Sequence, residues 1–279
     1  MNWILGTAIL VVVGYLLDRE VYFYEGVHLG PRVQAWLYDR WSRKYDEGKR
    51  ESQLRDDEML AQPLLDATKD VPEPFVLDFA TGTGRLSYAL INRPEFDGHI
   101  IALDLSQGML EQAVEKLIGR GDSAPTRNVE FLRHQTLPLP FPDAAFDVVC
   151  ALEVLELFPT MDEPLAEFSR VLRPGGVFLT SRGTEESGRK AKVKSVKEYT
   201  SLLEKNGFEN VQATKWWKLF DRVLAVKNGS SAPVKSRRLQ DVLKCSACGK
   251  IQWGRTSNTL KCGHCGRELT VTREGIVLN

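Results

Sequence analysis

The sequence has 279 residues, of which 43% are hydrophobic and 27% are charged, and its formal net charge is zero. This length allows one sizeable domain with additional segments, and the composition is that of an ordinary folded protein, which excludes a disordered chain. The charge is unevenly spread, because residues 227–279 carry 10 Lys and Arg against 3 Asp and Glu, whereas residues 1–226 carry 27 against 34. We therefore expect an acidic body and a basic tail that form different modules.

The chain begins with an apolar segment, Asn2–Leu17, that carries no charge. A spanning helix needs about 20 apolar residues, with about 17 as the lower limit. We therefore predict an N-terminal transmembrane helix as a membrane anchor over residues 1–18, with residues 3–17 in contact with the membrane. The alternative is a buried N-terminal helix. A cleaved signal peptide is disfavoured, because no Lys or Arg precedes Trp3.

The charges that follow the apolar segment predict its orientation. Basic residues collect on the cytoplasmic side of a membrane. The predicted localisation is therefore the membrane, with a single-pass anchor and the catalytic domain on the cytoplasmic side. The basic residues concerned are Arg19, Arg32, Arg40, Arg43 and Lys44.

Residues 19–70 are polar, charged and aromatic. In "VQAWLYDRWSRKYDE" the apolar residues recur at helical spacing, which predicts a helical lead-in to the main domain. The segment "DVPEP", Asp70–Pro74, ends this lead-in.

Residues 71–226 alternate between short apolar runs and amphipathic segments. This alternation predicts an α/β fold with a doubly wound, Rossmann-like sheet of seven strands. Ligands of such sheets bind outside the carboxyl ends of the strands. The predicted strands are residues 75–79, 99–106, 129–134, 146–152, 177–182, 209–217 and 220–227. The predicted helices are residues 84–93, 106–121, 163–176 and 196–208, with Ser106 as a cap and Gly121 as a terminator of the second.

A glycine-containing loop follows the first predicted strand, in "VLDFATGTGRLSY" from Val76 to Tyr88. Gly82 and Gly84 allow a tight turn and a close approach of backbone N–H groups to a nucleotide. A dinucleotide fingerprint would have a third glycine where Ser87 stands, and a P-loop would have Lys followed by Ser or Thr. The alternative is that these glycines serve only the turn.

The order of several blocks carries a family resemblance. "LDFATGTGRL", "IIALDLSQGMLEQA", "LPFPDAAFDVVCALEVLELF" and "FSRVLRPGGVFLTS" resemble the motifs of class I S-adenosylmethionine-dependent methyltransferases, and "YDRWSRKYDE" resembles their approach segment. The resemblance covers roughly residues 37–226 and is nearest to the ubiquinone/menaquinone C-methyltransferase-like group. It implies a methyltransferase with S-adenosyl-L-methionine as cofactor.

Asp104 is the principal candidate for cofactor binding, because it ends a strand and follows Gly84 by 20 residues. Its carboxylate can accept hydrogen bonds from both ribose hydroxyls, although it could instead only cap the next helix. The resemblance places Asp78 near the methionine amino group, Tyr45 over the cofactor, and Gln135 where relatives have an Asp for the adenine amino group. The other residues expected at the cofactor are Ala80, Thr81, Gly82, Thr83, Gly84, Leu105 and Met109.

The catalytic base is left open. Glu153 and His134 are candidates, and for each a structural role is the alternative. Leu157 stands where many relatives have a His, which weakens the expectation of a histidine base at that position.

Four of the five cysteines form two CxxC pairs, Cys245 with Cys248 and Cys262 with Cys265. After a linker at residues 227–238, residues 239–279 are therefore predicted to fold as a four-cysteine zinc ribbon. A redox pair or disulfides are the alternative. Cys150 is expected to be a small core residue.

Three functions are compatible with these features. The first is a methyltransferase that acts on a small-molecule or lipid substrate at the membrane, with a quinone or amino-lipid type of acceptor. The second is a methyltransferase that acts on nucleic acid or protein recruited by the basic zinc ribbon. The third is a non-catalytic subunit with a methyltransferase fold.

Overall fold

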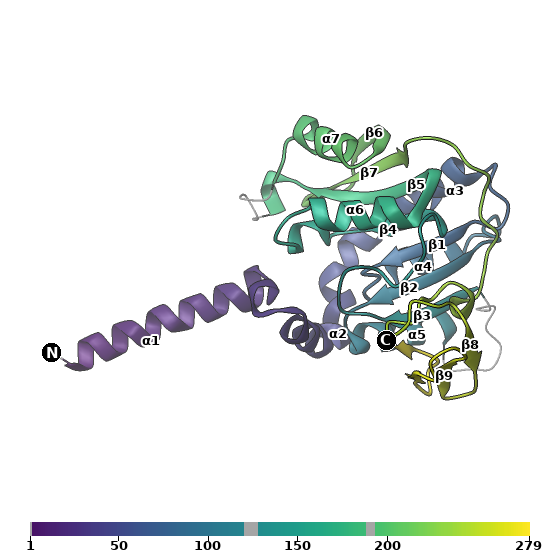
Figure 1. Cartoon of the computed structure of the whole chain (residues 1–279). Coiled ribbons are helices and arrows are strands. Elements are labelled where there is room, and N and C mark those ends of the chain that lie inside the picture. Colours follow the sequence, from purple (N-terminus) through teal and green to yellow (C-terminus); the bar gives the residue numbers. More distant parts are fainter. Residues whose placement is uncertain (1, 120–127, 188–192) are drawn as a thin grey trace.

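The computed structural model describes residues 2–119, 128–187 and 193–279 (Figure 1). Its α-helices are α1 Asn2–Asp18, α2 Pro31–Gln53, α3 Gln62–Thr68, α4 Arg85–Ile91, α5 Gln107–Ile118, α6 Asp162–Val171 and α7 Val196–Lys205. Its strands are β1 Phe75–Phe79, β2 His99–Asp104, β3 Val129–Arg133, β4 Phe146–Ala151, β5 Leu172–Gly183, β6 Phe208–Lys215, β7 Phe220–Lys227, β8 Trp253–Arg255, β9 Thr259–Cys262, β10 Glu268–Val271 and β11 Val277–Leu278. Short helical turns lie at Arg19–Phe23, Val27–Leu29, Asp57–Ala61, Leu155–Leu157, Glu185–Ser187 and Leu239–Asp241.

The seven strands expected from the sequence form one contiguous part of the sheet. Their order is β6-β7-β5-β4-β1-β2-β3. Strands β1 to β5 pair in parallel, whereas β6 and β7 form an antiparallel hairpin whose second strand runs antiparallel to β5. The Rossmann-like prediction is therefore confirmed for this part of the chain.

The sheet is larger than predicted, because the C-terminal segment continues it to eleven strands. Val277 and Leu278 of β11 pair in parallel with Leu132 and Arg133 of β3, and β10, β9 and β8 follow in antiparallel order. Without β11, strand β3 would be an edge with unpaired N–H and C=O groups. The C-terminal segment covers that edge and is thus joined to the domain by backbone hydrogen bonds.

The buried core is divided between the two faces of the sheet. Neighbouring strand residues point to opposite faces, so Leu77 lies in one core and Val76 in the other. Helices α6 and α7 cover the first face, and α3, α4 and α5 cover the second. Cys150 is fully buried in the second core, as predicted. The first core also includes the C-terminal residues Leu239, Val242, Leu243, Leu260, Leu269, Val271 and Val277.

The helices α4 to α7 all end earlier than predicted, and two of these ends have a local cause. Helix α5 begins as expected, since the Ser106 hydroxyl accepts a hydrogen bond from Met109 N at 3.0 Å, but it ends at Ile118 before Gly119, whose φ is +70°. The predicted terminator Gly121 lies outside the described residues. Helix α6 ends at Val171 rather than at the glycines, because a residue that precedes a proline favours an extended backbone and Arg173 precedes Pro174.

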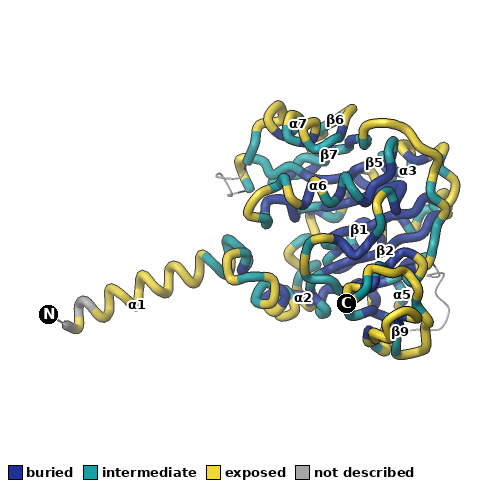
Figure 2. The backbone as a smooth tube through the Cα atoms, viewed as in Figure 1, coloured by how far each residue is buried: buried dark blue, intermediate teal, exposed yellow. Residues whose placement is uncertain are grey.

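Helix α1 projects from the body and exposes its apolar side chains (Figures 1 and 2). Its 17 residues rise by about 26 Å, whereas the hydrocarbon core of a bilayer is about 30 Å thick. No helix in the described part of the chain is long and apolar enough to cross a membrane. The N-terminal transmembrane helix expected from the sequence is therefore not confirmed.

Asp147 in β4 connects several elements of the domain, and its side chain is fully buried. The carboxylate accepts hydrogen bonds from Phe75 N at 3.0 Å, from Arg173 Nε at 2.6 Å and from Val234 N at 3.0 Å. It thereby joins β1 and β5 to residues 227–238. This segment, expected from its composition to be a linker, is fastened to the body.

Replacing Asp147 should destabilise the protein strongly. In Asp147→Ala the buried Arg173 guanidinium loses its charge partner, and breaking a buried ion pair costs about 3–5 kcal/mol. The free energy of unfolding from urea denaturation measures this loss. The matched control is Asp143→Ala, because Asp143 pairs with Arg170 while its side chain is 76% exposed, and an exposed pair contributes about 0–1 kcal/mol. Equal losses in the two variants would contradict the role assigned to Asp147.

Candidate functional site

The glycine loop between β1 and α4 is held by Asp78, the last residue but one of β1. Asp78 Oδ2 accepts hydrogen bonds from the hydroxyls of Thr81 and Ser87, both at 2.7 Å. Ser87, which stands where a dinucleotide fingerprint has glycine, thus fixes the loop from the first turn of α4. Ala80 adopts a φ of +53°, a backbone conformation that is uncommon for residues other than glycine and that is often found at functional sites.

Asp104 at the end of β2 binds the loop from the neighbouring strand. Its Oδ2 accepts from Gly82 N and its Oδ1 accepts from Ser106 N, both at 2.8 Å. Burial raises the pKa of Asp104 to about 6, and the charge of Asp78 acts in the same direction. Each carboxylate oxygen has a second lone-pair direction, so the group can also accept hydroxyl donors from a ligand.

The two glycines of the loop have different roles. A Cβ on Gly82 would have only the Tyr45 ring within 4.0 Å, so this residue presents backbone to open space. A Cβ on Gly84 would lie 2.9 Å from Leu117 Cδ1, so Gly84 is needed for the packing of the loop against α5. Both have positive φ angles, +56° and +78°.

Two cavities meet at Ala80, and we call them the large and the small chamber. The large chamber has a volume of about 370 Å³, and its lining includes Asp104, Leu105, His134 and Gln135. Its other lining residues are mostly apolar, and they include Val27, Pro31, Phe79, Leu103, Leu137, Val154, Leu157 and Phe158. The small chamber has a volume of about 50 Å³ and is lined by Tyr45, Lys49, Gln53, Asp78, Thr81, Gly82, Thr83, Arg85, Leu86, Leu152 and Glu153.

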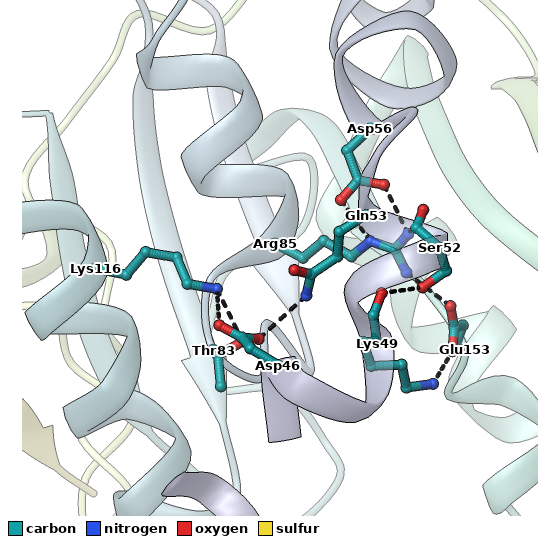
Figure 3. Close-up of polar contacts among 9 residues, drawn as sticks. All are labelled: Asp46, Lys49, Ser52, Gln53, Asp56, Thr83, Arg85, Lys116 and Glu153. Carbon is teal, nitrogen blue, oxygen red and sulfur yellow. Dashed lines mark hydrogen bonds and ion pairs between the residues drawn. The ribbon is translucent and has the colours of Figure 1, made fainter. Parts of the chain in front are cut away.

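Helix α2 closes the small chamber and is attached to the loop by polar contacts (Figure 3). The Asp46 carboxylate accepts from Thr83 Oγ1 at 2.6 Å and pairs with Lys116 Nζ at 2.5 Å. Nearer the start of α2, Asp39 Oδ1 accepts from Ser106 Oγ at 2.6 Å and from Gly108 N at 2.8 Å. One helix thus contacts both α4 and α5 where they begin.

Arg85 is the centre of a second set of contacts under α2 (Figure 3). Its guanidinium binds the Asp56 carboxylate in bidentate fashion, with both N–O distances at 2.6 Å, and reaches Glu153 Oε1 at 2.9 Å. Lys49 Nζ lies 2.5 Å from the other oxygen of Glu153. Arg85 also stacks on the Trp216 ring, with its guanidinium carbon 4.3 Å from the ring centroid. Charges in this buried network are therefore compensated.

These contacts bear on the two candidate bases. Both carboxylate oxygens of Glu153 are held by cations, so proton abstraction by this group would require two ion pairs to break. Its backbone φ is +53°, which is uncommon for a residue other than glycine. His134 lines the large chamber, and burial lowers the pKa of its imidazole, which is therefore neutral near pH 7. Leu157, where relatives have a His, lines the same chamber as an apolar wall.

Most of the predicted cofactor residues are brought together. Ala80, Asp104, Leu105 and Gln135 line the large chamber, and Tyr45, Asp78, Ala80, Thr81, Gly82 and Thr83 line the small one. Gly84 and Met109 line neither of them; Met109 is buried in the first turn of α5. Burial raises the pKa of Tyr45 to about 12, so its phenol stays protonated near neutrality.

Sequence reasoning missed the polar face of α2 and its partner Arg85. The signal was present as polar residues spaced three, four and seven positions apart, which share one face of a helix. These residues are Asp39, Ser42, Asp46, Lys49 and Gln53.

The four C-terminal cysteines also meet in one place. Their sulfur atoms all lie within 4.8 Å of one another, with Cys245 and Cys265 at 3.6 Å and Cys248 and Cys262 at 3.7 Å. A zinc ion with Zn–S bonds of about 2.3 Å requires sulfur separations of about 3.8 Å, whereas a disulfide requires about 2 Å. The donor set and its spacing therefore fit a tetrahedral metal ion better than disulfides.

Comparisons with known proteins define the class of domain. Residues 76–176 match the family model described as "Methyltransferase domain". An uncharacterized chloroplastic methyltransferase of Arabidopsis thaliana is 28% identical over 226 residues, which are 80% of this chain and 55% of that protein. A ubiquinone/menaquinone biosynthesis C-methyltransferase of Francisella tularensis is 38% identical over 104 residues, which are 37% of this chain and 40% of that protein.

Solved structures share the fold. A SAM-dependent methyltransferase from Aquifex aeolicus has a TM-score of 0.54 at 22% identity and covers 68% of this chain and 98% of that one. The [4+2]-cyclase SpnF has a TM-score of 0.52 at 19% identity and covers 62% of this chain and 81% of that one. A likeness at this level of identity concerns the fold alone.

Residues 76–176 are therefore similar to a methyltransferase domain, and the relatives found by sequence comparison are methyltransferases. The chain spans about half the length, or less, of the curated relatives that it matches. Their similarity accordingly describes the domain rather than the acceptor of the methyl group.

The raised pKa of Asp104 predicts a pH-dependent affinity for the cofactor. Ribose hydroxyls donate hydrogen bonds, so they bind the ionised carboxylate better than the protonated one. Affinity should rise with pH through about 6 and then level off, with a change of up to about tenfold per pH unit below that value. Calorimetric titrations with S-adenosylmethionine between pH 5 and pH 7 measure it.

Asp104→Asn is the control for this titration. The variant lacks the ionisable group, so it should bind weakly and with little dependence on pH. A wild-type affinity that is constant from pH 5 to pH 7 would contradict the ribose-binding role of Asp104. The same carboxyl affects stability in the opposite sense, because a buried acid with a raised pKa lowers the free energy of unfolding as pH rises from about 4 to about 6.

Proposed function

We propose that this protein transfers a methyl group from S-adenosylmethionine to a small-molecule or lipid acceptor at a membrane surface, with a quinone or amino-lipid type of acceptor. The observation that carries the proposal is the composition of the large chamber, whose lining combines Asp104, His134 and Gln135 with mostly apolar side chains. The bound cofactor would supply an electrophilic sulfonium methyl group. The protein's part is to bind and align the two reactants.

The residues of this chain fit the cofactor. Asp104 would accept the ribose hydroxyls, Leu105 and Gln135 would flank the adenine, and the N–H-rich turn at Gly82 would face the methionine portion. A Gln135 amide oxygen can accept the adenine amino group as an Asp would. The small chamber beneath α2 would hold the polar end of the methionine portion, where Tyr45 and Lys49 lie.

The apolar end of the large chamber supports an acceptor with an apolar body. Phe79, Val154 and Phe158 line it, whereas the ion-paired Lys49, Arg85 and Glu153 line the small chamber. Apolar walls with a few polar groups are typical of small-molecule sites. A strongly charged polymer such as nucleic acid would find no matching surface in that part of the chamber.

The position of α1 supports a membrane surface as the place of reaction. Val27 and Pro31, which line the large chamber, follow the end of α1 at Asp18 by nine and thirteen residues. An apolar helix without a polar face is stabilised by an apolar surrounding on all sides, as lipid provides. Attachment through residues 3–17 would keep the chamber close to lipid-borne acceptors and raise their effective concentration.

We further propose that the four-cysteine module binds zinc, with Cys245, Cys248, Cys262 and Cys265 as ligands. Their separations match a tetrahedral site, and each pair is followed by a glycine with a positive φ, Gly249 at +71° and Gly266 at +76°. The module has its apolar side chains in the core of the methyltransferase domain. This packing favours a role of the module in stabilising the methyltransferase domain. It does not favour a separate domain that recruits protein or nucleic acid.

The acceptor class is tested with the full chain in the presence of vesicles. The enzyme is incubated with radiolabelled S-adenosylmethionine and either a membrane lipid extract or a pool of water-soluble metabolites. We expect label in the lipid phase. Methyl transfer that is confined to water-soluble products would contradict the proposal.

The contribution of α1 is tested with the double variant Leu10→Asp and Val13→Asp. A charged Asp inside a bilayer costs about 2.5–3.5 kcal/mol, so membrane attachment and lipid labelling should fall by roughly 100-fold or more. Affinity for S-adenosylmethionine should stay unchanged. The matched control is Leu54→Asp, because Leu54 is also exposed but lies at the end of α2. Equal labelling by all three proteins would refute attachment through α1.

A further inference from the structure

Asn279 lies between the four-cysteine module and the large chamber. Its backbone N donates to Arg133 O at 3.1 Å and so extends the pairing of β11 with β3. Its side-chain Nδ2 is 3.2 Å from His134 Nδ1. On the other side its Oδ1 is 3.5 Å from the Ser246 hydroxyl, a long contact. One amide side chain thus touches both parts of the protein.

Each neighbour of Asn279 belongs to a different site. Ser246 lies between Cys245 and Cys248, in the first cysteine turn, so its position depends on how that turn is held. His134 lines the large chamber between β3 and Gln135, and its backbone N donates to Asp104 O at 3.0 Å. A shift of His134 would therefore also move the end of β2, which carries Asp104.

The orientation of the Asn279 amide determines the state of the imidazole. With Oδ1 accepting from Ser246, the Nδ2 group donates to His134 Nδ1, and a neutral imidazole whose Nδ1 accepts carries its proton on Nε2. Burial of His134 favours this neutral form. His134 would then carry its proton on Nε2 and would not be a general base, which leaves the acceptor to lose its proton elsewhere.

We propose that Asn279 is a positioning residue that couples the four-cysteine metal site to the cofactor chamber by fixing the ring orientation and tautomer of His134. Metal binding holds the turn with Ser246, the turn and β11 hold Asn279, and Asn279 holds His134 beside Asp104. The proposal rests on the proposed function in one respect, that the large chamber binds S-adenosylmethionine. Metal loading and cofactor affinity are then linked, and the link passes through this amide.

Asn279→Ala tests the coupling in the full chain, with Asn258→Ala as the matched control. Asn258 belongs to the same module, in the turn between β8 and β9, and its side chain contacts only Thr256 among the interactions of the described residues. Three quantities are measured for each protein: zinc content, the dissociation constant for S-adenosylmethionine, and the ¹⁵N chemical shifts of the His134 ring. The metal-free proteins are prepared with a chelator and compared in the same way, with circular dichroism to verify folding.

We expect one zinc ion in all three proteins. Asn279→Ala should bind S-adenosylmethionine about 5- to 20-fold more weakly than wild type and should alter the His134 ring shifts, whereas Asn258→Ala should match wild type. Chelation should weaken binding by wild type by a similar factor and should have little additional effect on Asn279→Ala, because the two changes remove one coupling. Asn279→Asp should move the His134 proton to Nδ1, since a carboxylate can only accept.

Two results would overturn the coupling. One is an Asn279→Ala variant with the dissociation constant and ring shifts of wild type. The other is a chelation effect of equal size in wild type and Asn279→Ala. Failure of the proposed function is distinguished by the ring shifts, because they report His134 even if wild type binds no S-adenosylmethionine.

Discussion

The carboxylate of Asp104 is the interaction on which the geometry of the site depends. It joins the glycine loop after β1 to the start of α5 through two backbone N–H groups, and the backbone oxygen of the same residue accepts from His134 after β3. Three neighbouring strand ends are thus fixed relative to one another. Because the Asp104 carboxylate is buried, hydrogen-bond donors rather than water stabilise its ionised form. A ligand with two hydroxyls would add two such donors.

Helix α2 completes the site from outside the sheet. It is polar along the face that meets α4 and α5, and each acid on that face has a donor or a cation opposite it (Figure 3). Polar contacts of α2, rather than apolar packing, therefore close the small chamber. The apolar end of the large chamber lies instead beside the chain that leads to α1.

Much of the domain could be predicted from the sequence, for local reasons. The runs at Phe75–Phe79 and Phe146–Ala151 are apolar except for one aspartate each, as expected of central parallel strands, and both form strands within one residue of the predicted bounds. The glycine loop and the Ser106 cap could be predicted because glycine favours tight turns and serine favours the first position before a helix. Asp104 could be proposed as a ligand-binding carboxylate because ligands of such sheets bind at the carboxyl ends of the strands.

Other features depend on long-range contacts that a single sequence does not reveal. Strand β11 has two residues, too few for a periodic signal, and its pairing with β3 changes the sheet from seven strands to eleven. The Arg85 network needs α2, α4 and Glu153, two residues after β4, to meet in space. The apolar N-terminal segment is at the lower limit of length for a spanning helix, since α1 has 17 residues and ends at Asp18.

The most direct test of the account is a calorimetric titration of the full chain with S-adenosylmethionine and, separately, with NADH. We predict binding of S-adenosylmethionine at one site per chain with micromolar affinity and no binding of NADH, since Ser87 and the Asp78 contacts replace the dinucleotide fingerprint. Absence of binding by S-adenosylmethionine, or equal binding of NADH, would contradict the assignment of the chambers at Ala80 to this cofactor.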